Sequence, residues 1–282
     1  MTVIPNHQGL SIIVTSYERM ISLHKNLTSL MDQDMGNIPI EVIVVNNSSR
    51  VTLRPTRWTK IGRLFRQYSN IKLINSQHNW RIYFRYGIAY FALYDTILFM
   101  DDDIYFQDST MMRQMYDTLM GLGEYDIVSC WNMLWTQWTD TELFHVSASL
   151  LDPDLTELTK TDTSGPGISM FNKQLILDAR AQKHVITWNI PDAGDYALGL
   201  LSQMLWGGTT YAIPSYKRVS FSEEFQKGAL HLKEPNFVTD RMRLFKEMLN
   251  NGYTPVIKRE TLAKNSPEQK LINRMEERTK SW

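Results

Sequence analysis

The sequence predicts an α/β domain with a Rossmann-like, mostly parallel central sheet flanked by helices. Three largely apolar runs, at residues 10–14, 40–45 and 96–100, have the length and composition of buried strands. Residues 20–31 lie between the first two runs and repeat apolar side chains at helical spacing. Strand, helix and strand in succession form a right-handed unit with parallel strands. Polar residues follow each run, and ligands of such sheets bind at the carboxyl ends of the strands.

The remaining elements continue this alternation. A short strand is expected at 71–75, and an aromatic-rich helix at 78–94 leads into the strand at 96–100. Asp108 fits the N-cap of a helix over residues 109–122. Further predicted elements are an apolar strand at 127–131, a turn and strand at 164–171, and helices at 173–180, 193–205, 237–249 and from 266 onward.

The composition excludes several classes of protein. The chain has 282 residues, of which 43% are hydrophobic and 21% charged, and this fits one large globular domain rather than a disordered chain. Lys plus Arg equals Asp plus Glu, so we expect no broad attraction to nucleic acid. The single cysteine, Cys130, excludes an intramolecular disulfide and fits a reducing compartment. Its apolar neighbours predict a buried side chain.

Two further features concern location and charge. The N-terminus lacks the features of a signal peptide, and no apolar run approaches the ~20 residues that span a bilayer. We therefore expect a cytoplasmic protein without a transmembrane segment. Residues 50–72 contain seven basic side chains and no acidic one. This stretch indicates either a solvated face or an attraction for an anionic substrate.

Three consecutive aspartates, Asp101, Asp102 and Asp103, follow the apolar run at 96–100. Because side chains alternate along an extended chain, we expect Asp101 and Asp103 to point one way and Asp102 the other. Carboxylates this close repel one another unless a cation compensates them, and Mn²⁺ or Mg²⁺ suits oxygen ligands. The alternative is an acidic strand end that binds no ligand.

Four separated motifs resemble, in the expected order, those of the GT-A nucleotide-sugar glycosyltransferases, with the inverting, family-2-like members as the nearest pattern. The three aspartates resemble the DXD motif, and Gly-Pro-Gly-Ile at 165–168 resembles the glycine loop on the acceptor side. Asp195 follows Gly194, which stands where the xED motif usually has a glutamate. His231 resembles the C-terminal histidine of the metal site. The likeness spans about residues 9–232.

The resemblance implies a GT-A fold in a single domain over residues 1–282. About 9–130 would form the nucleotide-sugar donor half, about 131–235 the acceptor half and about 236–282 a C-terminal helical extension. Small soluble transferases of this type also occur in large DNA viruses of algae, which the size of this chain fits. We expect one or two tryptophans of the acceptor half to face the acceptor and the rest to lie in the core. These tryptophans are Trp131, Trp135, Trp138, Trp188 and Trp206.

The resemblance also assigns the donor and metal ligands. Residues 11–19 resemble the first strand and nucleotide-binding turn, in which Tyr17 can stack on a base. Arg85, or its competitor Arg81, would reach the nucleotide. Uncharged Asn46 and Asn47 replace aspartates that are common in the family. The nucleotide-binding set is Thr15, Ser16, Tyr17, Arg19, Asn46, Asn47, Arg85, Asp101 and Asp102; the Mn²⁺ or Mg²⁺ ligands are Asp101, Asp103 and His231. A single histidine between leucines is otherwise a common structural residue.

The implied function is a metal-dependent transfer of a hexose or pentose from a UDP-sugar, such as UDP-xylose, UDP-galactose or UDP-glucose, to a hydroxyl of a glycan or glycoprotein. An inverting transfer needs a carboxylate base, which would be Asp195 or the nearby Asp192, although aspartate at a helix start is also a common cap. The alternatives are a retaining enzyme of the same fold, a sugar nucleotidyltransferase and a non-catalytic glycan-binding protein. The turn at 15–19 contains no glycine, which argues against a nucleotidyltransferase, and neither a dinucleotide-binding nor a Walker motif is present.

Overall fold

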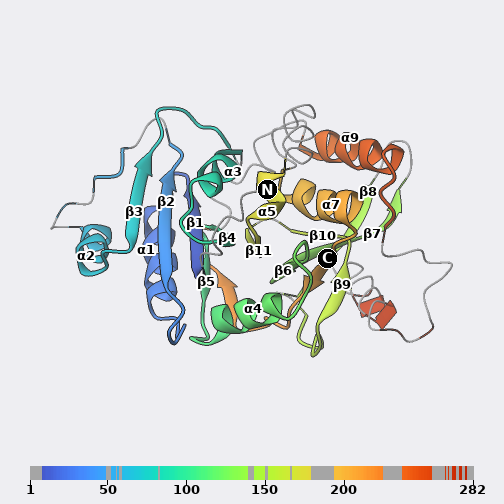
Figure 1. Cartoon of the computed structure of the whole chain (residues 1–282), viewed down its shortest axis with the longest axis horizontal. Coiled ribbons are helices and arrows are strands. Elements are labelled where there is room, and N and C mark those ends of the chain that lie inside the picture. Colours follow the sequence, from blue (N-terminus) through green and yellow to red (C-terminus); the bar gives the residue numbers. More distant parts are fainter. Residues whose placement is uncertain are drawn as a thin grey trace.

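The computed structural model describes residues 8–48, 52–54, 56, 59–81, 83–138, 143–149, 152–165, 167–178, 194–224, 237–255, 264, 266, 269–270, 273–274 and 277. Within these ranges the chain forms a mixed central sheet with helices on both faces, the GT-A architecture that the sequence predicts (Figure 1). No helix in the described ranges has the length and apolarity that a bilayer crossing requires.

The central sheet has eight strands in the order β3-β2-β1-β4-β11-β6-β12-β9. The first four in this order are parallel, as expected. β11 lies antiparallel between β4 and β6, so the four parallel strands and the later part of the chain share one sheet. The strands are β1 (Leu10–Ser16), β2 (Ile40–Asn46), β3 (Ile71–Asn75), β4 (Thr96–Asp101), β6 (Ile127–Ser129), β9 (Thr159–Thr161), β11 (Ile168–Asn172) and β12 (Thr210–Ala212).

Two smaller sheets lie beside the central one. β10 (Thr163–Ser164), β7 (Trp131–Trp138) and β8 (Leu143–Ser149) form the first, and β13 (Val219–Phe221) pairs with β5 (Ile104–Phe106) in the second. β5 of the second sheet directly follows the three aspartates, and its pairing with β13 brings a distant segment next to them. The helices are α1 (Met20–Met31), α2 (Lys60–Gln67), α3 (Tyr83–Tyr90), α4 (Met111–Met120), α5 (Gln174–Leu177), α7 (Gly194–Trp206) and α9 (Phe237–Asn250).

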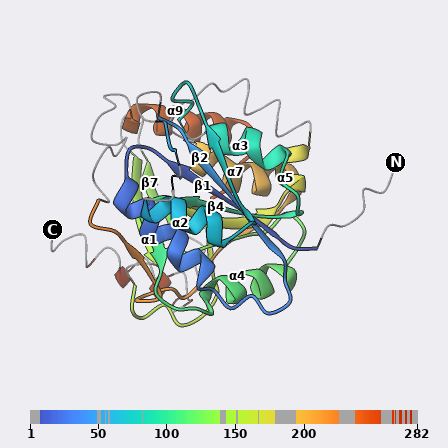
Figure 2. The same cartoon turned by 90° about the vertical axis from the view of Figure 1, so that its left-hand side faces the viewer.

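The helices cover the two faces of the sheet because its strands are apolar on both sides. In β1, Leu10, Ile12 and Val14 belong to the core shared with α1 and α4. Ile13 belongs to the opposite core, shared with α3, α5 and Leu198 of α7. Figure 2 shows α1 and α4 below the sheet and α3, α5 and α7 above it. This layering holds the carboxyl ends of the parallel strands in fixed register.

Most of the predicted elements are confirmed, and the differences have local causes. The helix expected over 78–94 is only α3, because the preceding chain is a loop in which Arg81 has a φ of +53°. The helix expected over 109–122 begins at Met111, and Asp108 accepts a hydrogen bond from the backbone of Thr110 instead of capping it directly. The helix expected over 173–180 is the short α5, and the predicted tail helix lies largely outside the described residues.

Several elements were not predicted: the short strands β5, β9, β12 and β13, the helix α2 and the β7–β8 hairpin. α2 forms within the basic stretch, where only Ile61 and Gly62 are buried and the side chain of Thr59 accepts a hydrogen bond from the backbone of Gly62. The β7–β8 hairpin occupies the tryptophan-rich region. Cys130 is fully buried, as expected, and burial raises the pKa of its thiol to about 12.

A buried carboxylate fastens the edge of the sheet opposite the aspartates. Glu41 of β2 is 3% exposed and accepts hydrogen bonds from Ser11 Oγ at 2.6 Å, Lys72 Nζ at 2.6 Å and the Leu93 backbone at 2.5 Å. Burial alone would raise the pKa of Glu41, but the bonds from Lys72, Ser11 and Leu93 outweigh it and lower the pKa. The carboxylate thus joins three strands and the segment before β4.

We expect Glu41→Gln to lower the free energy of unfolding at pH 7 by about 1–3 kcal/mol, because buried donors lose a charged acceptor. A group whose pKa is lower in the folded state stabilises it above the unfolded pKa and ceases to do so as the pH falls through the folded value. Urea unfolding should therefore show a difference from wild type that shrinks toward pH ~3. Glu124→Gln, at an exposed position, is the control, and a difference independent of pH would contradict the assignment.

Candidate functional site

The polar residues that follow β1, β2 and β4 meet at one edge of the sheet. The register pairs Thr15 of β1 with Asp101 of β4, and Ser16 of β1 with Asn46 of β2. The backbone N–H of Asn47 continues this arrangement by donating to the carbonyl of Ser16 at 2.8 Å. The three strand ends therefore form the floor of one site, as the sequence predicts for an open α/β sheet.

The three aspartates do not alternate as expected. β4 ends at Asp101, and Asp102 and Asp103 lie in the turn that leads to β5. Asp102 and Asp103 are 2% and 5% exposed and share a cationic partner, whereas the Asp101 side chain is 26% exposed. The prediction that Asp101 and Asp103 face away from Asp102 was wrong, because the strand ends at Asp101 and the next two residues form a turn instead of continuing the alternation.

Two arginines bind these carboxylates. Nη1 of Arg19 lies 3.1 Å from Asp102 Oδ1 and 2.5 Å from Asp103 Oδ2. Nη2 of Arg85 lies 2.6 Å from Asp101 Oδ1. Both arginines are largely buried, at 12% and 3% side-chain exposure. Three carboxyl groups thus face two guanidinium groups, so the arginines cannot balance all three aspartates when each is ionised.

The pKa values of the aspartates reflect their burial and this shortage of positive charge. Burial raises the pKa of Asp102 to about 6, against the opposing effect of Arg19. Burial and the charge of Asp101 raise the pKa of Asp103 to about 8, again against Arg19. Burial would lower the pKa of Arg19, but the three aspartates together raise it. The cluster is therefore incompletely neutralised by its own arginines.

The donor set fits a hard divalent cation in combination with a substrate. In the described part of the chain, no three His, Cys, Asp or Glu side chains converge as a complete metal site, and His231 lies outside it. Mg²⁺ is commonly held by one or two protein carboxylates together with substrate phosphates rather than by a cage of protein ligands. Asp101 and Asp103 offer only oxygen atoms as ligands, and two arginines do not balance the three aspartates, which matches that kind of binding.

The turn after β1 is built against the aspartates. The backbone N–H of Tyr17 donates to Asp102 Oδ2 at 3.0 Å, and Glu18 has a φ of +59°, which turns the chain into α1. Ser48 Oγ donates to Glu18 Oε1 at 3.1 Å. The buried hydroxyl oxygen of Thr15 has no hydrogen-bond partner among the described residues. Thr15 therefore offers an unused polar atom at the strand end where a nucleotide is expected.

Asn46 and Asn47 are each 2% exposed and bind other parts of the protein. Asn46 Nδ2 donates to Asn75 Oδ1 at 2.8 Å. Asn47 Oδ1 accepts from the backbone of Trp80 at 2.9 Å, and its Nδ2 donates to the Arg81 carbonyl at 2.8 Å. The Asn47 amide thus holds the loop before α3 in place and the Asn46 amide binds the end of β3, whereas a direct contact of either with a nucleotide stays a prediction.

The predicted glycine loop lies against the aspartates. Gly167 has a φ of +104°, and a Cβ there would lie 2.4 Å from Ile104 Cδ1 and 3.3 Å from Asp101 Oδ2. Its carbonyl accepts a hydrogen bond from the Asp101 backbone at 2.7 Å. Glycine is thus required for the close approach of this loop to β4.

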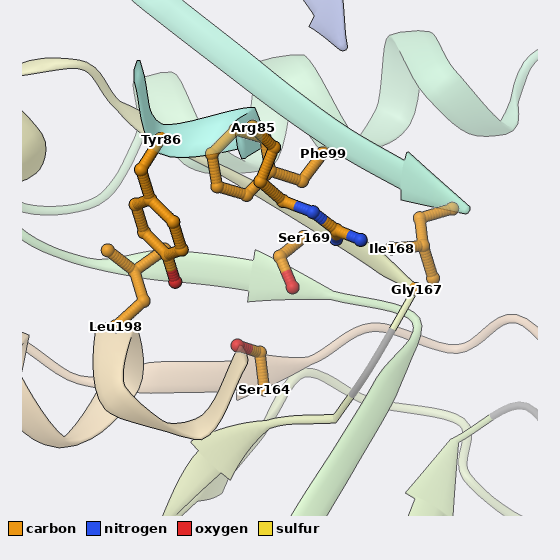
Figure 3. A pocket seen from close by; sticks show the side chains of 8 residues that line it. All are labelled: Arg85, Tyr86, Phe99, Ser164, Gly167, Ile168, Ser169 and Leu198. Carbon is orange, nitrogen blue, oxygen red and sulfur yellow. The ribbon is translucent and has the colours of Figure 1, made fainter. Parts of the chain in front are cut away.

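Arg85 reaches into a small cavity beneath this loop. The cavity has about 10 Å³ of space, which is enough for one water molecule. Figure 3 shows the Arg85 guanidinium extending toward Gly167, with Ser164 and Ser169 across the same space and Leu198 of α7 at its wall. α7 therefore borders, through Leu198, the cavity that Arg85 also lines.

The predicted acceptor-side residues are only partly described. Asp195 is the second residue of α7, close in sequence to Leu198, and its side chain lies outside the described parts of the chain. Asp192 and Trp188 lie outside the described residues, as do the side chains of Trp135 and Trp138. Trp131 packs against Phe221 with ring centroids 4.9 Å apart, and Trp206 stacks on Tyr125 at the same distance.

Sequence reasoning missed two residues that shape the aspartate turn. Asn26 is fully buried in α1, and its Nδ2 donates to the carbonyls of Asp101 at 3.0 Å and Ile104 at 2.7 Å. The signal for it is an asparagine on the apolar stripe of the helix, next to Leu27. The backbone N–H of Ser222 donates to the Asp103 carbonyl at 2.7 Å, a contact between segments far apart in sequence that no local pattern indicates.

Comparisons with known proteins agree with this architecture. A search of curated proteins by sequence found no significant match. Among solved structures, the crystal structure of S. aureus TarS 1-349 is similar, with a TM-score of 0.53 and 13% sequence identity. The similarity covers 89% of this chain and 67% of that one, and at this identity it shows the fold. The sequence profile described as "Glycosyl transferase family 2" matches residues 11–178, more than half of the chain, which contain β1, the aspartates and the glycine loop. The protein belongs to glycosyl transferase family 2 and has a GT-A fold.

Proposed function

We propose that this family 2 glycosyltransferase moves a hexose or pentose from a UDP-sugar to a hydroxyl of a glycan or glycoprotein, with inversion and with the help of Mn²⁺ or Mg²⁺. The donors considered are UDP-xylose, UDP-galactose and UDP-glucose. The observation that carries the proposal is the cluster of Asp101, Asp102 and Asp103 with Arg19 and Arg85 at the carboxyl edge of the sheet.

The nucleoside diphosphate would lie between the turn after β1 and α3. Arg85 supports this placement because its forked, permanently charged donors suit phosphate oxygens and its position is fixed by Asp101 and by the ring of Phe99, 5.5 Å away. The unpartnered hydroxyl of Thr15 supplies a further polar contact. Tyr17, Ser16, Asn46 and the loop held by Asn47 would enclose the uridine.

The cation would be held by Asp103 and Asp101, with His231 as a candidate third ligand. When bound it supplies positive charge that offsets the charge developing on the diphosphate as the sugar–phosphate bond breaks. The residues of the protein have a separate task. Asp102, which is buried and bonded to the Tyr17 backbone, keeps the turn in place, and Asn26 fixes the carbonyls on either side of it.

For an inverting transfer the acceptor hydroxyl must lose its proton as it attacks the anomeric carbon. Asp195 is our candidate for the base, and its place in the first turn of α7 supports this choice, because Leu198 of the same helix borders the Arg85 cavity. Asp192 precedes it closely and is the alternative. The attacking hydroxyl and the base would then lie on one side of the glycine loop and the donor on the other.

A retaining reaction is the alternative within the same fold, and it needs no such base. A sugar nucleotidyltransferase is less consistent with the turn after β1, where non-glycine residues occupy positions 15–19. A glycan-binding protein without activity would leave the aspartates and their arginines without a task. Screening UDP-xylose, UDP-galactose and UDP-glucose for donor hydrolysis in Mn²⁺ tests the proposal. If neither these three nor any other UDP-sugar were hydrolysed, the proposal would be overturned. NMR of the product distinguishes inversion from retention.

We expect Asp195→Asn to lower kcat by about 10²- to 10⁴-fold, the usual effect of removing a general base, with little change in UDP affinity. Steady-state kinetics and UDP calorimetry provide the two values. Asp32→Asn, at an exposed position of the chain, is the matched control and should behave as wild type. A large loss of UDP affinity in Asp195→Asn would move this residue to the donor site instead.

We expect Asp103→Asn to abolish metal-dependent turnover and leave the fold intact. A carboxyl with a pKa raised on folding stabilises the protein below its unfolded pKa and ceases to do so as the pH rises through the folded value of about 8. The variant, which has no charge to bury, should therefore melt at a temperature no lower than wild type at pH 8 in EDTA and compare less favourably at pH 5. Near-normal turnover would refute the assignment.

A further inference from the structure

We propose that Arg19 is a tethered counter-ion that the divalent cation displaces, and that its guanidinium then binds the diphosphate. The inference rests on the function proposed above and deepens it, because it makes one side chain the link between metal binding and nucleotide binding. It concerns Arg19 and its two carboxylate partners, Asp102 and Asp103.

The Arg19 guanidinium contacts the carboxylate oxygen of Asp103 that a cation would bind. A single atom, Nη1, lies within hydrogen-bond distance of both Asp102 Oδ1 and Asp103 Oδ2, at 3.1 and 2.5 Å. A metal ion bound to Asp103 would thus lie a few ångströms from a like charge. Two positive charges at such a distance repel strongly even where the surroundings are partly solvated. The guanidinium and the metal ion therefore compete for the same carboxylate.

The turn remains supported when Arg19 leaves it. The backbone of Tyr17 donates to Asp102 Oδ2, the oxygen that Arg19 does not use. The Asp103 carbonyl accepts from the Ser222 backbone at 2.7 Å, and Asn26 binds the carbonyl of Asp101. None of these three contacts involves the guanidinium. Displacement of Arg19 therefore changes the charge of the site without removing the hydrogen bonds that shape it.

Arg85 cannot serve in the same way. Its side chain is 3% exposed, lies over the ring of Phe99 and reaches Asp101 from inside the fold. Arg19 directly precedes α1, and its side chain is 12% exposed. Of the two cations at the aspartates, Arg19 is thus the more exposed one, and we assign to it the exchange of a carboxylate for a ligand phosphate at the same strand edge.

This exchange predicts effects of opposite sign. Without the guanidinium, the metal ion alone binds more tightly, because its competitor is gone. With the metal ion present, UDP binds more weakly, because one phosphate contact is lost. A purely structural arginine would weaken both equilibria when it is removed, and a distant charge would leave UDP binding unchanged. The pair of signs therefore distinguishes an exchanging counter-ion from either alternative.

The test compares wild type, Arg19→Met and Arg19→Lys with Arg113→Met as control. Arg113→Met also removes one arginine and one Arg–Asp pair, that with Asp117 on the surface of α4. Mn²⁺ alone is titrated by electron paramagnetic resonance, and UDP is titrated by calorimetry in saturating Mn²⁺. We expect Arg19→Met to bind Mn²⁺ at least about tenfold more tightly and Mn²⁺-dependent UDP at least about tenfold more weakly. Arg19→Lys, which keeps the charge, should fall between it and wild type.

The outcomes separate this inference from the proposed function. If wild type binds neither Mn²⁺ nor UDP, the proposed function fails and this inference with it. If wild type binds both but Arg19→Met weakens both, or weakens neither, only the exchange is overturned. If Arg19→Met does not fold, the hydrogen bonds donated by Tyr17, Asn26 and Ser222 do not suffice to hold the turn, and the exchange is overturned on that ground. Arg113→Met should match wild type in both titrations.

Discussion

The site depends on an imbalance of charge at the end of one buried strand. Three carboxyl groups lie at the last residue of β4 and in the turn after it, and the fold brings only two guanidinium groups to them, one from the turn before α1 and one from α3. Burial, together with the neighbouring carboxyl groups, raises the pKa of Asp102 and Asp103, so the cluster resists carrying its full negative charge without a further cation. A cluster of this kind favours any ligand that brings positive charge, provided that the ligand also satisfies the arginines. A metal ion together with a diphosphate does both, which is why we propose that they bind together.

The remainder of the fold maintains this imbalance. The apolar strands are covered on both faces, so their carboxyl ends cannot move relative to one another. Asn26 and Ser222 fix the backbone of the aspartate turn, and Gly167 allows the glycine loop to approach Asp101 more closely than a side chain would permit. The arginines are thus presented by elements that pack independently of each other. The position of each charge is set by hydrophobic burial and by backbone hydrogen bonds, not by the ion pairs alone.

Much of this arrangement could be predicted from local patterns. The parallel strands, α1 and the convergence of Thr15, Asn46 and Asp101 follow from hydrophobic runs that end in polar residues. The pairing of Arg19 with Asp102 and Asp103 does not, because it depends on where the strand stops, and the aspartates themselves carry no signal for that. α2 was missed because three of its eight residues are basic and only Ile61 and Gly62 are buried, and the β7–β8 hairpin because its tryptophans do not alternate with polar residues in a simple way. Asn26 shows that a polar residue within an apolar helix stripe is a useful indication of a shaped site. The roles of Asp195 and His231 rest on motif order, since their side chains lie outside the described parts of the chain.

A crystal structure of the protein with UDP and Mn²⁺ is the decisive experiment. We expect the diphosphate at the carboxyl edge of β1 and β4, between the turn at Tyr17 and the guanidinium of Arg85. We also expect a Mn²⁺ ion held by Asp103 or Asp101 beside the diphosphate. If UDP occupied another surface, or bound at this edge while the aspartates held no metal ion, the proposed role of the aspartates would be wrong.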